Sequence, residues 1–201
     1  MSEAWNGAGR SDATPETLIR DYLRAKDENR AHLIGSVFCE SACLEMQVKT
    51  RDIRFPAVSQ GSAVIADVLA RRFNQTYENI YTFCLDKPVA ESANSPSAAF
   101  VCDWLVGMSE KESGNVRVGC GRYEWIFRQE PPRRVERLTI TIETMQTIPA
   151  HWMPEILKWL LALDYPWSSA QAVCRSAPEI KLLAPVLRYL GRALPSCQQQ
   201  K

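Results

Sequence analysis

The segment from Thr14 to Val48 constrains the fold of this chain more than any other part of the sequence. Thr14 is a favourable N-cap, Pro15 suits the first turn of a helix, and apolar residues then recur at helical spacing. A short second helix is predicted over residues 32–38, and alternation from Cys43 to Lys49 predicts a strand. Because each of these elements has one apolar side, the segment predicts helices packed on the sheet that contains the strand.

The rest of the chain predicts further strands and then further helices. Residues 62–77 have one apolar stripe, which predicts a third helix. Four strands separated by turn-rich segments favour an antiparallel meander, and they are predicted over residues 79–85, 98–108, 116–128 and 134–145. Helices are then predicted over residues 149–163, 168–175 and 178–194, with a break or kink at Pro185.

The strand predicted over residues 116–128 has two apolar sets of opposite parity. The first set is Val116, Val118 and Cys120, and the second is Tyr123, Trp125 and Phe127. A strand of period two does not place both sets on one face, and Gly119 and Gly121 flank the change. We therefore expect a bulge or a sharp bend near Gly121, which would curve the sheet around a pocket.

Composition limits the class of protein. Apolar residues make up 46% of the 201 residues, which is enough for a sizeable core. The formal net charge is only +1, so we expect no nucleic-acid partner. No apolar run reaches the length of about 18 residues that spans a membrane, so we expect no membrane partner. The polar residues 1–13 lack the apolar core of a secretory signal, and we expect a disordered arm on a cytoplasmic protein.

The seven cysteines are odd in number and include no CxxC pair, which does not fit a disulfide framework. Most lie in apolar strand-like runs, so we expect buried, reduced thiols. His32 and His151 are the only histidines and lie far from any cysteine cluster, so we expect no metal site. Gly-rich phosphate loops are absent from the sequence, and we expect no organic cofactor.

Residues 14–48 resemble the opening of the nuclear transport factor 2-like superfamily, which includes the ketosteroid isomerases and the SnoaL-like proteins. Pro15 and Glu16 open the helix, Tyr22 falls on the isomerases' catalytic tyrosine, and Phe38 falls on their helix-end phenylalanine. The segment RYEWIFRQEPPRRVERLTITIE is similar to the last two strands of that family.

The resemblance implies the cystatin-like α+β cone, in which N-terminal helices pack on a strongly curved antiparallel sheet that encloses a pocket. It divides the chain into a disordered arm (1–13), a nuclear transport factor 2-like, SnoaL-like domain (14–147) and a helical C-terminal extension (148–201). The extension is too apolar to be free in solvent. The sequence leaves open whether it covers the mouth of the cone, packs on the outer face of the sheet or mediates dimerisation.

Two positions depart from the isomerase pattern. The isomerases need a carboxylate general base on the first strand, where this chain has Met46. They also need a protonated acid in the sheet, and the alignment places Tyr123 there. Tyr22 and Tyr123 could donate hydrogen bonds to a developing oxyanion, but the resemblance does not imply the usual steroid isomerisation without a base at Met46.

Three candidate catalytic residues each have a structural alternative. Tyr22 is either a donor in the pocket or a core aromatic residue. Asp103 interrupts the apolar run AFVCDWLVG, and it is either a proton-transfer group in a closed pocket or a solvated side chain on the opposite face. His32 is either a general base or an exposed residue near a helix start.

Bulky apolar side chains predict the lining of a pocket for a hydrophobic ligand. They are Met46, Leu44, Trp104, Trp125 and Phe127, with Tyr123 beside them. The alternative is that the same side chains fill a core without a cavity.

Two hypotheses follow from the sequence. The first is a SnoaL-like or ketosteroid isomerase-like protein that binds a hydrophobic small molecule, with acid/base chemistry of the isomerase or hydratase type if it is an enzyme. The second is a non-catalytic interaction domain that forms a homodimer through the outer face of the sheet. The sequence does not decide whether the protein is an enzyme.

Overall fold

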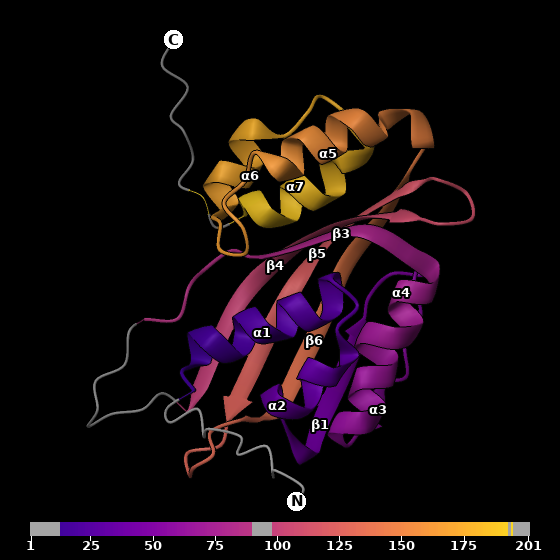
Figure 1. Cartoon of the computed structure of the whole chain (residues 1–201). Coiled ribbons are helices and arrows are strands. Elements are labelled where there is room, and N and C mark those ends of the chain that lie inside the picture. Colours follow the sequence, from indigo (N-terminus) through magenta and orange to yellow (C-terminus); the bar gives the residue numbers. More distant parts are fainter. Residues whose placement is uncertain (1–12, 90–97, 193, 195–201) are drawn as a thin grey trace, which may run out of the picture.

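A computed structural model describes residues 13–89, 98–192 and 194 (Figure 1). Apart from Ala13, the predicted N-terminal arm lies outside these residues. Six strands form one sheet in the order β2-β1-β6-β5-β4-β3. They are β1 (Phe38–Val48), β2 (Val58–Gln60), β3 (Tyr77–Cys84), β4 (Ala99–Glu110), β5 (Val116–Phe127) and β6 (Val135–Ile148).

The N-terminal helices cover one face of the sheet, as predicted (Figure 1). They are α1 (Pro15–Asp27), η1 (Ala31–Leu33), α2 (Ile34–Val37), α3 (Ser62–Ala66), η2 (Asp67–Arg72) and α4 (Phe73–Thr76). The predicted cap of α1 is confirmed, because the Thr17 N–H donates to Thr14 Oγ1 at 3.2 Å. The helix predicted over residues 62–77 is present, but its middle part, η2, winds as a π-helix.

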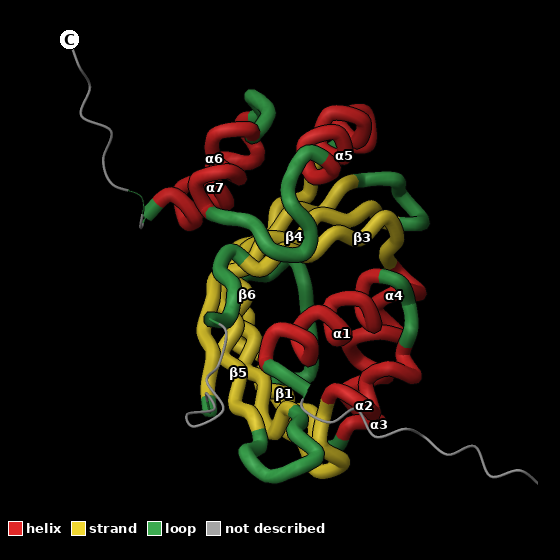
Figure 2. The backbone as a smooth tube through the Cα atoms, turned by 60° about the vertical axis from the view of Figure 1, so that its left-hand side comes forward, coloured by secondary structure: helices red, strands yellow, loops and turns green. Residues whose placement is uncertain are grey.

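The α+β architecture is confirmed, and the sheet is mixed. Strands β3 to β6 form the predicted antiparallel meander. However, β1 runs parallel to β6, and the short β2 pairs with β1 in antiparallel orientation. Figure 2 shows the sheet curling around α1, with β3 and β4 turned across the top of β5 and β6. This curvature gives the sheet a concave inner face toward α1 and a convex outer face.

The C-terminal extension packs on the outer face, which is one of the three arrangements that the sequence left open (Figure 2). It contains η3 (Ala150–Trp152), α5 (Met153–Leu161), α6 (Ala170–Ser176), η4 (Lys181–Leu183) and α7 (Ala184–Gly191). Pro185 lies in the first turn of α7, so it starts this helix and does not kink it. Between α5 and α6 the chain reaches the free edge of β3, where Trp167 forms a parallel bridge with Cys84.

The sheet is therefore shared by two hydrophobic cores. The inner core, between the sheet and α1–α4, contains Tyr123, Trp125 and Phe127, and the outer core, beneath α5–α7, contains Val116, Val118 and Cys120. The change of parity along β5 thus reflects regular alternation in a strand whose outer face is buried by the extension in its first half and exposed from Arg122 onward.

A bulge does lie at the predicted place, but the extra residue is on β6. Cys120 pairs with Thr144 and Gly121 with Ile142, which leaves Glu143 unpaired between them. The bulge reverses the parity of β6, so that Ile142 and Met145 both face the inner core.

The cysteines fit the prediction of reduced thiols. Cys39, Cys84, Cys102 and Cys120 are buried, Cys43 and Cys174 are half-buried, and all six are free thiols. Cys197 lies outside the described residues. Among the helices that the structure describes, none is long and apolar enough to cross a membrane.

We expect Gly121→Ala to destabilise the protein by about 3 kcal/mol or more. A Cβ atom at this position would lie 1.8 Å from the Thr141 carbonyl oxygen, so the backbone of β6 would have to shift. Gly35→Ala is the matched control, because its Cβ would meet nothing within 4 Å. Urea unfolding monitored by circular dichroism measures both changes. Equal stability of the two variants would contradict the close approach of β5 and β6.

We expect Leu160→Ala to cost about 3 kcal/mol, because it removes a buried side chain that packs on β4 at Gly107. Leu161, the next residue of α5, is 65% exposed, so Leu161→Ala should change the free energy of unfolding by less than about 0.5 kcal/mol. The same urea titration compares the two. A large loss from Leu161→Ala alone would mean that α5 packs through its other side.

Candidate functional site

Two adjoining cavities lie on the inner side of the sheet. The outer cavity has a volume of about 470 Å³ and lies between the segment 51–56 and the helices η2 and α4. The inner chamber has about 40 Å³ of free space, enclosed by α1 and the inner face of the sheet. Ile53, Phe55 and Phe73 line both and form the wall between them.

Aromatic side chains fill most of the space around the inner chamber. The Tyr22 ring contacts Tyr123 and Trp125, with centroids 6.1 Å and 5.1 Å apart, and Tyr123 stacks on Trp104 at 5.6 Å. About 10–15 Å³ of such free space holds one water molecule, so the chamber has room for a few ordered waters or a small ligand group.

Two residues that line this chamber carry buried hydrogen-bond donors without an acceptor among the described residues. The Tyr22 hydroxyl and the Trp104 indole N–H are buried and donate no hydrogen bond within the described part of the chain. Burial raises the pKa of Tyr22 above its usual range, and the neighbouring Tyr123 hydroxyl lowers it by less. Burial also raises the pKa of Tyr123. Both phenols are therefore neutral donors at physiological pH.

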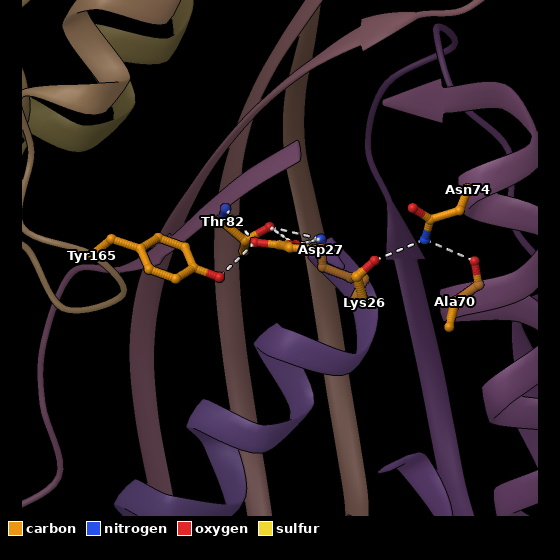
Figure 3. A network of polar contacts seen from close by, with 6 residues as sticks. All are labelled: Lys26, Asp27, Ala70, Asn74, Thr82 and Tyr165. Atoms are coloured by element: carbon orange, nitrogen blue, oxygen red, sulfur yellow. Dashed lines mark hydrogen bonds and ion pairs between the residues drawn. The ribbon is translucent and has the colours of Figure 1, made fainter. Parts of the chain in front are cut away.

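A buried ion pair lies at the end of α1 beside the chamber (Figure 3). The side chains of Lys26 and Asp27 are only 6% and 3% exposed, and Lys26 Nζ lies 2.7 Å from Asp27 Oδ1. Lys26 Nζ also donates to Thr82 Oγ1 at 2.6 Å and lies 4.9 Å from the centre of the Phe73 ring. Burial of two charges is tolerated because each is paired and hydrogen-bonded.

The Asp27 carboxylate has all its acceptor positions in use. Oδ1 accepts from Lys26 Nζ and from the Thr82 hydroxyl at 2.8 Å. Oδ2 accepts from the Thr82 backbone N–H at 2.8 Å and from the Tyr165 hydroxyl at 3.1 Å. A carboxylate offers about four lone-pair sites, so Asp27 has no vacant site with which to take a proton from a ligand.

The chamber therefore presents donors and no base. Lys26 has three N–H groups, of which two are used by Asp27 and Thr82, and it lines the chamber together with Tyr22 and Trp104. None of the described residues that line the chamber is Asp, Glu or His. Such a site can bind an acceptor such as a carbonyl oxygen. Over residues 13–89 and 98–192, no group of three or more His, Cys, Asp or Glu side chains is placed to hold a metal ion.

The structure brings together four of the residues that the sequence singled out. Tyr22, Tyr123, Met46 and Trp104 all line the inner chamber. Leu44, Trp125 and Phe127 are buried in the same inner core but do not line the chamber.

Asp103 and His32 lie away from the chamber. The alternation of β4 turns Trp104 inward, so Asp103 faces outward, where Arg192 Nη2 donates to both carboxylate oxygens at 2.9 Å and 2.8 Å. The Tyr189 hydroxyl also donates to it, at 3.3 Å. His32 is exposed in η1. Neither side chain is placed to transfer a proton to a ligand in the chamber.

Sequence reasoning missed Lys26 and Asp27. The available signal was a lysine on the buried stripe of α1, at helical spacing from Ile19 and Tyr22. The partners were not visible, because Thr82 and Tyr165 are 55 and 138 residues away from Asp27 along the chain.

We expect Tyr165→Phe to lower the free energy of unfolding by about 1 kcal/mol, because it removes a hydrogen bond to the buried Asp27 carboxylate. Tyr81→Phe is the matched control. The Tyr81 ring lies 6.4 Å from the Tyr165 ring, but among the described contacts its hydroxyl makes no hydrogen bond. Urea unfolding at pH 7 compares the two variants, and equal losses would contradict a specific role for Tyr165.

The effect of Tyr165→Phe should also depend on pH. Burial raises the pKa of Tyr165, and the negative charge of Asp27 raises it further. Tyrosines of the unfolded chain ionise near pH 10, so the contribution of Tyr165 is complete below about pH 10 and is lost as the pH rises toward its raised pKa. The stability difference between wild type and Tyr165→Phe should therefore shrink above about pH 10 and stay constant below it.

Comparisons with known proteins agree with this geometry. The sequence matches no protein-family model and no curated protein. Among solved structures, it is similar to a nuclear transport factor 2-like superfamily protein from Salmonella enterica subsp. enterica serovar Typhimurium str. LT2, with 15% identity and a TM-score of 0.50 over 64% of this chain and 88% of that chain.

Two further similar structures are LinA and a LinA-type dehydrochlorinase. LinA has 10% identity and a TM-score of 0.52 over 65% of this chain and 84% of its own. Hexachlorocyclohexane dehydrochlorinase LinA-type3 from Novosphingobium barchaimii LL02 has 13% identity and a TM-score of 0.50 over 65% of this chain and 85% of its own. The curved sheet, the helices on its inner face and these likenesses show that the chain has the nuclear transport factor 2-like fold.

Proposed function

We propose that the protein binds a small hydrophobic molecule in the outer cavity, with one end of the molecule reaching toward the inner chamber. The observation that carries this proposal is a cavity of about 470 Å³ whose inner wall is formed by Ile53, Phe55 and Phe73. Cavities of this volume, with apolar walls and a few polar groups, are typical of small-molecule sites.

The donors of the inner chamber support a ligand with an acceptor atom. Tyr22 and Trp104 both line the same small space and carry donors without an acceptor among the described residues, and a carbonyl oxygen is the simplest group that would satisfy such donors. Admitting one end of a ligand into this space needs only small side-chain movements. Met46 and Met145 also line it, and methionine side chains adapt readily.

The fold neighbours are compatible with a hydrophobic ligand. Among them, the hexachlorocyclohexane dehydrochlorinases are named for an apolar ring compound. At identities of 12% and 13% this likeness supports only the use of the same fold for a ligand of that kind.

The lining favours binding over proton transfer. Tyr22 and Tyr123 fit the role of donors, but Met46 occupies the position that a base would need, and the lone pairs of Asp27 are occupied. The nearly filled inner chamber also favours the second candidate function, a non-catalytic interaction domain. Homodimer formation remains a prediction, and Val101 and Ile126 are the exposed apolar residues of the uncovered outer face.

Binding of N-phenyl-1-naphthylamine, a neutral fluorescent probe with three aromatic rings, tests this proposal. Thr76 is exposed at the edge of the outer cavity, so Thr76→Trp should fill the cavity without disturbing the core. We expect this variant to weaken probe binding at least tenfold. Gln75→Trp, at the neighbouring exposed position that does not line the cavity, should leave binding unchanged.

Two outcomes would contradict the proposal. Failure of the wild-type protein to bind the probe would favour the filled interaction domain. Equal binding by wild type and Thr76→Trp, together with weaker binding by Ile126→Ala, would place the probe on the outer face of the sheet.

A further inference from the structure

The rim of the outer cavity is rich in positive charge. Three arginine side chains, Arg51, Arg54 and Arg72, line the cavity together with a single carboxylate, Asp52, and all four side chains are exposed. The whole chain has a net charge of only +1, so this cluster is a local feature and not part of a generally basic surface.

Two of these arginines have no partner of opposite charge. Arg72 Nε lies 2.6 Å from Asp67 Oδ2, so its charge is balanced within η2. Arg51 and Arg54 form no ion pair with any residue of the described chain, although Asp52 lies between them. The Asp52 Oδ2 atom instead accepts a hydrogen bond from the Thr50 hydroxyl at 2.7 Å. Two guanidinium groups are thus left to face the cavity or solvent.

The wall behind these arginines is apolar. The rings of Phe55 and Phe73 stack with centroids 6.4 Å apart, and Ile53 is 8% exposed. An anionic group would stay at the rim, because the only cation of the inner chamber, Lys26, is already paired with Asp27, and moving an anion into that chamber would cost its hydration.

Resting on the proposed function, we infer that the ligand is an amphipathic anion. Its hydrophobic body lies against Phe55 and Phe73, and its carboxylate, sulfonate or phosphate group binds Arg51 and Arg54. Guanidinium groups pair with such oxyanions through two parallel hydrogen bonds, which orients the ligand with its uncharged end inward.

A matched pair of probes separates this inference from the proposed function. Anilinonaphthalene sulfonate has the ring system of N-phenyl-1-naphthylamine and adds one sulfonate group. We expect the Arg51→Gln, Arg54→Gln double variant to bind the anionic probe about tenfold more weakly than wild type, since each exposed charge contact contributes a few-fold. Binding of the neutral probe should be unchanged. Raising the salt concentration should weaken only the anionic probe.

Arg71→Gln is the control for general charge, because Arg71 is exposed in η2 and does not line the cavity. An equal loss of anionic probe binding in this variant would overturn the inference in favour of a general field effect. Unchanged binding of both probes in the double variant would also overturn it, while leaving the proposed function intact. If wild type binds neither probe, the proposed function itself fails.

Discussion

Burial of one half of the sheet on both faces is the constraint on which the rest of this structure depends. Adjacent residues of β4 serve different cores, since Trp104 packs inward with α1 and Leu105 packs outward beneath α5–α7. The outer core is made by the extension, which also runs beside the edge of β3 and supplies Tyr165 to Asp27. The extension thus stabilises the convex face and one polar contact of the inner side.

The polar interior follows from the same arrangement. The end of α1 places a charged pair where only β3 and the Tyr165 segment can satisfy it, and four hydrogen bonds saturate Asp27. The phenol of Tyr22 and the indole of Trp104 are left as donors beside a small space. The chemistry of the interior is therefore that of a donor site for an acceptor group, and the charge that could select a ligand lies at the rim.

Local patterns predicted much of the fold. The Thr14 cap, the meander and the β6 bulge opposite Gly121 all follow from residues that are close together in the sequence. The parallel pairing of β1 with β6 was not predicted, because it joins residues about 94 positions apart, such as Glu45 and Thr139. For the same reason the sequence showed the lysine on the stripe of α1 but not its partners. The sequence left open on which face of the sheet Asp103 lies, and in the structure it lies on the outer face, where Arg192 donates to it.

The most direct test of this account is a crystal structure of the protein with N-phenyl-1-naphthylamine bound. The account predicts the rings of the probe against Phe55 and Phe73, with the nearer end directed toward Tyr22 and Trp104. A probe seated on the outer face near Val101 and Ile126, or among α5–α7, would contradict the claim that the concave side of the sheet is the binding side.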